Sequence, residues 1–329
     1  MNTKTPLLSI CIPTYNRSKY LIETIKSIVE SDGFNENDVE IVISDNCSTD
    51  DTSEIIKEWT DKYKNIRYFK RSVPTEFADR NFIEALSLGS GEYLKLNNDI
   101  VGFKQDTLKI ILSKIKENID TKEPVFFHSL IHNQISKNLN KLFKLKEPLK
   151  EFHFNNIDDF INTISTASTW IANFGCWKEH FESIGNKDKF LYNQFMQVDW
   201  TLDILNKYKR ATVYIKNFYN PFRIKKEGTV DAFNVHGKKY LEIYEYYLNN
   251  GLISKKSYEK EKRKVLIKVL IPMLALNLTS KNHFFKVNSF FDFVKDYKTN
   301  IYMYFAILIE LPLCIIFLLI KKFFLLFNK

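Results

Sequence analysis

The chain has 329 residues, enough for one large or two smaller domains, and its four cysteines, none in a CxxC pair, argue against a zinc knuckle or disulfide framework. Its net charge of +9 is uneven: residues 1–100 carry 12 Lys and Arg against 17 Asp and Glu, and the remainder carries 36 against 22. Basic charge mixed with many Phe and Tyr residues suits a nucleic-acid surface or an anionic membrane surface.

The first hundred residues alternate between strand and helix patterns. A continuous apolar run predicts a strand at 7–13, and further strands are predicted at 39–45, 65–71 and 91–97. Helical spacing of apolar residues predicts helices after Arg17, after Asp50, over 78–88 and around 108–115. This alternation predicts an open parallel α/β sheet, which binds ligands beyond the carboxyl ends of its strands. Polar clusters follow three of those ends, at 13–17, 45–50 and 97–99.

The pattern is more mixed beyond residue 120. We expect a strand over 124–132, an exposed basic segment over 133–160, and a helix near 199–208 after an aromatic stretch. From about residue 236 the chain is predicted to be mainly helical. No GxGxxG follows the first strand and no GxxxxGK[ST] occurs, which argues against dinucleotide-binding and P-loop proteins.

The C-terminal tail contains a long apolar stretch. Residues 301–320 carry one charge, Glu310, and a helix of this length would cross a bilayer core. Glu310 and Pro312 lie at its middle, where charge and a helix break are costly, and its flanks are basic and rich in Phe. We therefore expect attachment within one leaflet, with a single span as the alternative. Either arrangement explains the basic second part better than nucleic acid does.

Four ordered motifs carry a resemblance to a known family. They are "SICIPTYNRSKYLIETIKSI", "VEIVISDNCSTDDT", "DRNFIEALSLGSGEYLKLNND" and the later "NQFMQVDW". Together they resemble a family 2 glycosyltransferase of the GT-A fold, of the abequosyltransferase-like kind that builds bacterial O-antigen and capsule. The resemblance covers about the first 110 residues well and continues more loosely to about residue 245.

The resemblance implies different roles for three parts of the chain. Residues 1–120 would bind the nucleotide sugar, 121–245 would bind the acceptor and carry the catalytic residue, and 246–329 would form a helical tail associated with the membrane. The implied activity is transfer of a sugar from a nucleoside diphosphate sugar to an acceptor hydroxyl, usually with inversion and with Mg²⁺ or Mn²⁺. A lipid-linked glycan acceptor at the cytoplasmic face of the cell membrane would fit this activity.

The first two motifs match the nucleoside site of the family. The matching positions of the first-strand loop are Pro13, Thr14, Tyr15 and Arg17. Asp45 matches the carboxylate that reads the base, and Asn46 stands beside it. The alternative is that Asp45 only stabilises a turn, as we expect Asp50 to cap a helix.

The third motif supplies a basic residue and a possible metal ligand. Arg80 and Asn81 match an Arg-Asn pair, and Arg80 could steady the diphosphate or pair with Asp79 or Glu76 at the surface. Asp99 is the remaining carboxylate where the family usually has several, and we expect it to bind the metal with an amide oxygen of Asn97 or Asn98. Ordinary turn chemistry at a strand end is the alternative.

The fourth motif places Asp199 where the family carries its acid. We expect Asp199 to act as the base for the acceptor hydroxyl, with a helix N-cap as the alternative. The aromatic side chains that could flank the acceptor sugar are those of Trp170, Phe174, Trp177 and Trp200. Arg223 and His236 are possible contacts to the diphosphate or acceptor, although a solvated basic loop would explain this region too.

Two other functions stay open at this point. The reduced acidic motif could belong to a non-catalytic, membrane-tethered module that binds sugar nucleotides. A nucleotidyltransferase with a similar sheet is the weaker alternative, and it would release pyrophosphate.

Overall fold

A computed structural model describes residues 5–129, 148–222, 230–279, 285–286, 288–290, 294 and 301–327. The chain divides into two compact units, which are described separately. The first comprises Met1–Ile157, Thr166–Tyr192 and Met196–Arg223, and the second comprises Asp158–Ser165, Asn193–Phe195 and Ile224–Lys329.

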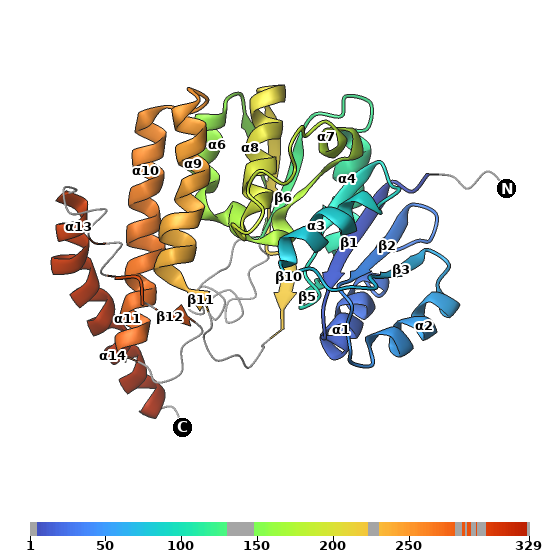
Figure 1. Ribbon diagram of the computed structural model, residues 1–329, viewed down its shortest axis with the longest axis horizontal. Coiled ribbons are helices and arrows are strands. Elements are labelled where there is room, and N and C mark those ends of the chain that lie inside the picture. The colour runs from blue at the N-terminus through green and yellow to red at the C-terminus, as the bar shows by residue number, and fades with distance from the viewer. Residues whose placement is uncertain are drawn as a thin grey trace. The chain divides into compact units, whose positions relative to one another are not determined.

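The first unit is built on a five-stranded sheet in the order β3-β2-β1-β4-β8 (Figure 1). Its strands are β1 (Leu8–Thr14), β2 (Val39–Asp45), β3 (Ile66–Lys70), β4 (Tyr93–Leu96) and β8 (Gly175–Trp177). The first four pair in parallel, and β8 adds an antiparallel edge to β4. This confirms the predicted mainly parallel α/β sheet, while the short edge strand β8 was not predicted.

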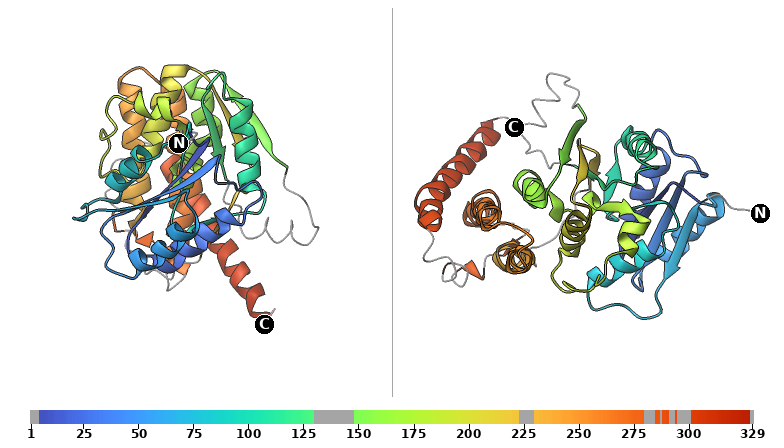
Figure 2. Two further views of the ribbon diagram at one scale, coloured as in Figure 1. Left: turned by 90° about the vertical axis from the view of Figure 1, so that its right-hand side faces the viewer. Right: turned by 90° about the horizontal axis from the view of Figure 1, so that it is seen from above.

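Helices cover both faces of this sheet. They are α1 (Ser18–Val29), α2 (Thr52–Lys62), α3 (Ala78–Ser87) and α4 (Thr107–Glu117). Figure 2 shows α1 on one face and α3 on the other. Every side chain of β1 and β2 is buried, as expected of parallel strands covered on two sides. The predicted strands and helices of this part of the chain are therefore confirmed.

Further strands and helices of the first unit extend it beyond the main sheet. The strands β6 (Val125–His128), β9 (Ala211–Ile215) and β7 (Lys150–Phe154) form a second sheet in that order, and β5 (Val101–Phe103) pairs with β10 (Tyr219–Pro221). Short 3₁₀ turns η1 (Ser165–Thr169) and η2 (Ile171–Asn173) precede α7 (Lys178–Glu182) and α8 (Met196–Tyr208).

Most described residues of the predicted exposed segment 133–160 are exposed or half-buried, but part of this segment forms regular structure that the sequence analysis did not predict. Residues 150–154 form β7, and α6 (Ile157–Ile164) begins soon afterwards. The alternation of Phe152 and Phe154 with polar residues is the strand pattern that we overlooked. Residues 133–147 lie outside the described part of the chain.

A buried lysine fixes the end of β4. Lys95 is fully buried, and its Nζ donates to the backbone carbonyls of Ala172, Phe174 and Leu96. Burial lowers the pKa of Lys95 to about 7. These bonds tie the strand to η2, so the residues that follow β4 start from a rigid position.

The second unit is helical, as the sequence predicted for the chain beyond residue 236. Besides most of α6, it contains the π-helical turn η3 (Phe233–Lys239), α9 (Tyr240–Asn249), α10 (Lys255–Val265), η4 (Leu266–Leu270), α11 (Ile271–Thr279), α13 (Ile301–Phe305), η5 (Ala306–Glu310) and α14 (Leu311–Phe327). Two short strands, β11 (Val230–Asp231) and β12 (Phe285–Lys286), pair in parallel. Helices α9 and α10 run side by side, and α14 packs against α11 (Figures 1 and 2).

Candidate active site

The end of β1 and the turn after β4 meet in a buried ion pair. The Arg17 guanidinium Nη1 donates to Oδ1 of Asp99 at 2.8 Å, and the Thr14 hydroxyl donates to Oδ2 at 2.9 Å. Asp99 is only 2% exposed, and its burial raises the pKa of the carboxyl while Arg17 and Thr14 oppose that shift. The parallel register of β1 and β4 brings these three predicted site residues together at the carboxyl ends of the strands.

The turn that carries Asp99 does not use the Asp99 carboxylate to close itself. The Asn97 amide nitrogen donates to the backbone carbonyls of Asn98 and Val101, and Thr24 donates to the backbone carbonyl of Asp99. These bonds leave the Asp99 side chain directed to β1 rather than to its own turn. The turn chemistry is therefore present at Asn97, whereas the Asp99 carboxylate bonds to Thr14 and Arg17, and metal binding by Asp99 stays a prediction.

Two amide oxygens beside Asp99 have no hydrogen-bond partner. They are Oδ1 of Asn97 and Oδ1 of Asn98, and both are buried. A buried acceptor without a donor is costly, so such a pair of oxygens points to a missing cation or donor. The carboxylate of Asp99 can accept more bonds than the two it makes.

The oxygen atoms of these residues therefore suit a hard divalent cation, although the site itself carries little negative charge. Mg²⁺ and Mn²⁺ prefer oxygen ligands, and Mg²⁺ commonly uses one or two carboxylates beside substrate phosphates and water. The described residues contain no cluster of three or more acidic, His or Cys side chains that could hold a metal alone. The Arg17 guanidinium already neutralises the one carboxylate, which weakens any cation site here.

Asp45 at the end of β2 is buried, and both of its carboxylate oxygens accept hydrogen bonds. Its Oδ1 accepts from the backbone N–H and the hydroxyl of Ser48, and its Oδ2 accepts from the Tyr68 hydroxyl at 2.5 Å. The bonds from Ser48 are those of a turn, as the structural alternative for Asp45 predicted. A ligand read by Asp45 would use its remaining acceptor capacity or replace the Tyr68 hydroxyl.

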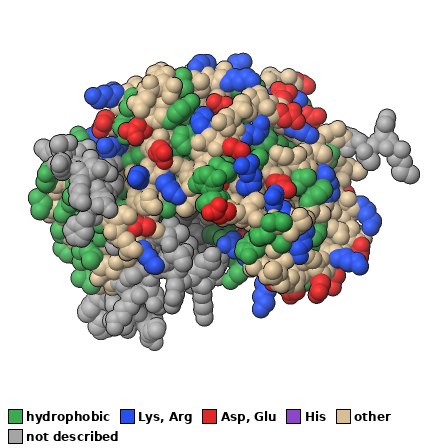
Figure 3. All heavy atoms as spheres, in the orientation of Figure 1, with side chains coloured by type: hydrophobic (Ala, Val, Ile, Leu, Met, Phe, Trp, Pro, Cys, Tyr) green, Lys and Arg blue, Asp and Glu red, His purple; other side chains and the backbone are tan. Residues whose placement is uncertain are grey.

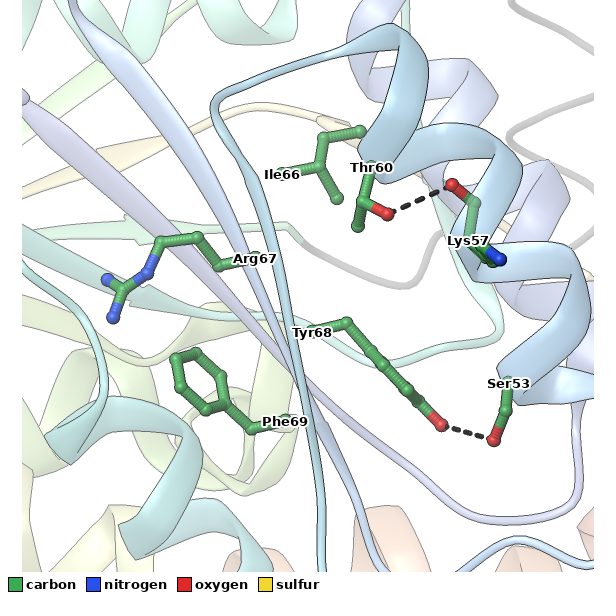
Figure 4. A pocket seen from close by; sticks show the side chains of 7 residues that line it. All are labelled: Ser53, Lys57, Thr60, Ile66, Arg67, Tyr68 and Phe69. Carbon is green, nitrogen blue, oxygen red and sulfur yellow. Dashed lines mark hydrogen bonds between the residues drawn. The ribbon is translucent and has the colours of Figure 1, made fainter.

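Tyr68 also borders a pocket between α2 and the edge strand β3. Figure 4 shows Tyr68 directed toward Ser53 of α2, with a hydrogen bond of 2.9 Å between the two hydroxyls, and Arg67 and Phe69 on the other side of the strand. The pocket has a volume of about 560 Å³. It is lined by residues of α2, among them Lys57 and Thr60, and by residues of β3. None of the predicted site residues lines it, so we do not place the donor there.

The loops that surround the strand ends are tied together by polar side chains. Oδ1 of Asn46 accepts from the backbone N–H and hydroxyl of Thr75, and Asp50 accepts from the N–H groups of Thr52 and Ser18. Asp50 thus caps the first turns of α2 and α1, as predicted. Asn46 is 8% exposed and connects two loops. Pro13 is buried within β1, whereas the next aromatic side chain, Tyr15, is exposed.

The Arg80 and Asn81 pair divides into a surface residue and a structural one. Arg80 forms an exposed ion pair with Asp188 at 2.8 Å, and neither predicted partner, Asp79 or Glu76, is the one observed. Asn81 is buried, accepts from the Ser44 hydroxyl and donates to the Ser44 carbonyl, which secures the end of β2. A ligand could therefore replace Asp188 as the partner of Arg80 with little loss of free energy, because exposed ion pairs are weak.

Asp199 lies in the first turn of α8 and forms a buried ion pair. Its Oδ1 accepts from Nζ of Lys189 at 3.0 Å, and the carboxylate side chain is 1% exposed. Helix α8 begins at Met196, so Asp199 is inside the helix and the N-cap alternative is wrong. Lys189 holds the carboxylate in one orientation.

The aromatic side chains that were predicted to flank the acceptor sugar are mostly buried. Trp200 is fully buried against Phe174 and Phe181, and its Nε1 donates to the Lys187 carbonyl. Trp177 is also fully buried, and Trp170 packs edge-on against Tyr219. Trp177 and Trp200 were predicted to flank a sugar but are core residues, whereas Trp170 is partly buried at the edge of the core. The sequence pattern of aromatic residues does not distinguish a core ring from one that contacts a ligand.

The last two predicted contacts lie elsewhere. Arg223 is outside the described residues. His236 belongs to the second unit, where its ring packs against Phe195 and burial lowers the pKa to about 4. A histidine with this pKa is neutral near pH 7 and does not offer a positive charge to a diphosphate.

Two residues that bond to predicted site residues, Tyr68 and Lys189, were missed by sequence reasoning, and no motif marked the exposed Tyr192. Tyr68, which bonds to Asp45, shares a strand face with Ile66 by simple alternation, and that pattern could have indicated it. Lys189, which pairs with Asp199, and the exposed Tyr192 lie in a segment without periodicity. No signal in the sequence identifies either of them.

Comparison with known proteins gives a family and two bacterial relatives. Residues 9–162 match the model of glycosyl transferase family 2. An abequosyltransferase of Salmonella typhimurium is 39% identical over 114 residues, which cover 35% of this chain and 34% of the relative. A GalNAc(5)-diNAcBac-PP-undecaprenol beta-1,3-glucosyltransferase of Campylobacter jejuni is 28% identical over 263 residues, covering 78% of this chain and 79% of the relative. The matched part thus spans about a third of the first relative and most of the second.

Solved structures support the same fold. The Staphylococcus aureus protein TarS (residues 1–349), solved with UDP-GlcNAc, has a TM-score of 0.54 at 18% identity, over 91% of this chain and 79% of that chain. A mannosyltransferase of Pyrobaculum calidifontis, solved with GDP-Man and Mn²⁺, has a TM-score of 0.52 at 14% identity, over 97% of this chain and 87% of that chain. At these identities the likeness shows the fold. The match over residues 9–162 and the two relatives thus support a family 2 glycosyltransferase, and the solved structures show the GT-A fold.

Proposed function

We propose that the chain transfers a sugar, with inversion, from a nucleoside diphosphate sugar to a hydroxyl of a lipid-linked glycan in O-antigen or capsule assembly. The observation that carries this proposal is the convergence of Thr14, Arg17 and Asp99 at the carboxyl ends of β1 and β4. The name of the Campylobacter jejuni relative includes a glycan on a PP-undecaprenol carrier, which supports a lipid-linked glycan acceptor, and the name of the Salmonella typhimurium relative supports sugar transfer.

The donor would bind across the strand ends. The exposed ring of Tyr15 can cover the base, and Asp45 can accept its N–H groups with its remaining acceptor capacity or in place of the Tyr68 hydroxyl. Arg17 is one-third exposed, so its remaining N–H donors can reach the diphosphate. Arg80 and Asn98 would complete the donor site from the neighbouring loops.

A bound Mg²⁺ or Mn²⁺ would supply positive charge to the departing diphosphate. Asp99 would hold it, with the unpartnered amide oxygens of Asn97 and Asn98 as further ligands. Arg17 would then share the diphosphate charge rather than neutralise Asp99. Because the protein provides one carboxylate, we expect the cation to bind tightly only together with the donor.

Asp199 would act as the general base. Its carboxylate takes the proton of the acceptor hydroxyl as that oxygen attacks the anomeric carbon, and the bond from this carbon to the diphosphate breaks on the opposite face. Lys189 keeps the carboxylate in position for this transfer. The acceptor has to enter where Asp199 is now covered, since the side chain is 1% exposed.

The activity can be tested by the release of nucleoside diphosphate from a panel of nucleotide sugars. We expect release with one donor, stimulated by a membrane extract that contains lipid-linked glycans, and reduced at least about tenfold when EDTA removes the metal. Added Mn²⁺ or Mg²⁺ should restore it. Pyrophosphate as the product would instead identify a nucleotidyltransferase.

One observation favours a second function, that of a non-catalytic module. The pairing of Asp99 with Arg17, together with amides in place of further acids, could mean that metal binding has been lost. Calorimetry separates the two functions. Binding of a nucleoside diphosphate that Mn²⁺ does not strengthen, with no release from any donor, would favour the module.

We also propose that the C-terminal helix attaches the protein to the cytoplasmic face of the cell membrane. Residues Tyr302–Ile320 have a mean hydropathy of 2.6 over 19 residues, and only 11% of them are buried. Apolar side chains gather along the left edge of Figure 3, over this helix. The exposed ones include Leu308, Ile309, Leu313, Ile316, Phe317, Leu319 and Ile320. Burying such a surface in lipid is strongly favourable.

Flotation of the full chain with phosphatidylglycerol vesicles tests this attachment. We expect co-flotation that persists at high salt, and its loss in the double variant Leu313→Glu, Phe317→Glu. Extraction by alkaline carbonate would indicate attachment in one leaflet, whereas resistance would indicate a span. A wild-type chain that stays at the bottom of the gradient contradicts the proposal.

A further inference from the structure

Tyr192 is one of two exposed aromatic side chains that the structure describes in the first unit, and the other is Tyr15. Tyr15 follows β1, at the proposed nucleoside site, whereas Tyr192 lies in the segment before α8 and is 52% exposed. An aromatic ring left in water costs free energy, so its position invites a partner. The proposed function has assigned none to Tyr192.

The backbone holds this ring in an unusual conformation. Tyr192 has a φ of 78°, in the left-handed region that a bulky residue rarely adopts, and Gln194 has a φ of 74°. Strain of this kind persists where surrounding contacts impose it and is frequent at ligand sites. The ring is also placed by Phe77, with the two ring centres 4.0 Å apart and the planes inclined by 69°.

Tyr192 forms one side of a small pocket within the first unit. The pocket has a volume of about 230 Å³, and it is lined by Arg71, Thr75, Glu76, Phe77, Arg80, Leu191 and Tyr192. This volume is below the roughly 300–1,000 Å³ of pockets for drug-sized ligands and suits a single ring. Its wall combines an aromatic face with guanidinium and carboxylate groups.

That combination matches the chemistry of a pyranose. The C–H groups of one sugar face pack against an aromatic ring, and the hydroxyls at the edge bond to planar charged groups. Arg80 and Glu76 line the pocket, and Arg80, which pairs with the exposed Asp188, would be shared between this pocket and the proposed donor site. A phosphate is a poorer fit, because Glu76 also lines the pocket and Arg71 is paired with Glu84.

The pocket connects to both halves of the proposed reaction. Thr75 in its wall is bonded to Asn46, which follows the proposed base-reading Asp45. On the other side, the segment of Tyr192 carries Lys189, which binds the proposed base Asp199. The pocket is thus linked to the donor loop by the bonds of Thr75, and its Tyr192 lies three residues along the chain from the lysine that binds the proposed base.

We infer that this pocket binds one pyranose ring of the acceptor glycan and that Tyr192 is its stacking platform. The assignment of the sugar to the acceptor rests on the proposed function. The existence of a sugar subsite rests on the residues that line the pocket. Tyr192 replaces the buried tryptophans as the aromatic contact to the sugar. Selectivity among acceptors would follow from the hydroxyls that meet Arg80 and Glu76.

The test is binding of methyl glycosides to the full chain, measured by saturation-transfer NMR with a saturating nucleoside diphosphate. We expect at least one of a panel of hexose, N-acetylhexosamine and deoxyhexose glycosides to bind, and Tyr192→Ala to weaken it by about tenfold. Tyr192→Trp should restore binding, because it keeps the platform. The control is Val73→Ala, which changes an exposed apolar side chain in the loop of Thr75 and Glu76 that does not itself line the pocket.

Calorimetry with the nucleoside diphosphate and with the nucleotide sugar shows whether the sugar in the pocket belongs to the donor or to the acceptor. Tyr192→Ala should change neither affinity by more than about twofold, whereas Tyr15→Ala should weaken both. If Tyr192→Ala weakens the nucleotide sugar but not the nucleoside diphosphate, the pocket belongs to the donor and the inference is overturned. It is also overturned if no glycoside binds or if Tyr192→Ala leaves binding unchanged. Tyr192-dependent glycoside binding without any sugar transfer would contradict the proposed function alone.

Discussion

Replacement of Asp199 by asparagine is expected to lower kcat by about 10²- to 10⁴-fold, the usual contribution of a positioned general base. The amide cannot take the proton of the acceptor hydroxyl, and it loses the ion pair with Lys189. The affinity for the nucleoside diphosphate should stay within about threefold, because Asp199 belongs to α8 and not to the donor loops. Release of nucleoside diphosphate in the presence of acceptor and calorimetry with the nucleotide measure the two quantities.

A structural effect of this substitution has to be separated from a chemical one. Asp199 is buried, so Asp199→Asn is expected to lower the thermal midpoint as well. Asp203→Asn is the matched control, since it changes a more exposed aspartate one turn further along the same helix. If Asp199→Asn stays folded and retains activity comparable to Asp203→Asn, then Asp199 is not the base.

Removal of the Asp99 carboxylate is the second large change. Asp99→Ala is expected to reduce donor-dependent release by at least about 10²-fold, since it removes the one acidic metal contact and leaves Arg17 without its partner. Calorimetry should show no strengthening of nucleoside diphosphate binding by Mn²⁺ in this variant. Asp51→Ala, at an exposed aspartate of the same unit, should leave both measurements unchanged.

The ion pair between Arg17 and Asp99 leads to a further prediction for the variant Arg17→Ala. Arg17→Ala removes the positive charge beside Asp99, so Mn²⁺ alone should bind more tightly than to the wild type. The same change removes a donor to the diphosphate, so the affinity for the nucleotide sugar should fall. Unchanged Mn²⁺ affinity in Arg17→Ala, together with full activity of Asp99→Ala, would show that no cation binds at this turn.

The site was only partly readable from the sequence. The family resemblance singled out Thr14, Arg17, Asp45, Asp99 and Asp199. The structure places Thr14 and Asp45 at strand ends, Arg17 just before α1, Asp99 in the turn after β4 and Asp199 in the first turn of α8. The resemblance did not indicate that Arg17 binds Asp99, because the two residues are 82 positions apart and pair only when β1 lies beside β4. The partner of a charged group is a property of the packed sheet.

The aromatic residues show the opposite error. The tryptophans of 170–200 were predicted to contact a sugar, yet Trp177 and Trp200 are fully buried. An aromatic side chain contributes equally well to a core and to a sugar-binding surface, so its local sequence does not decide between them. Tyr192, which no motif marked, is the exposed ring.

The sequence by itself determined the alternation of strands and helices and the polar residues at the strand ends. Both follow from local causes, because apolar periodicity and turn chemistry act over a few neighbouring residues. The tertiary structure decided which side chains meet: Arg17 with Asp99, Tyr68 with Asp45, and Lys189 with Asp199. Burial and long-range pairing depend on how the sheet and its loops pack together, and no local pattern records that arrangement.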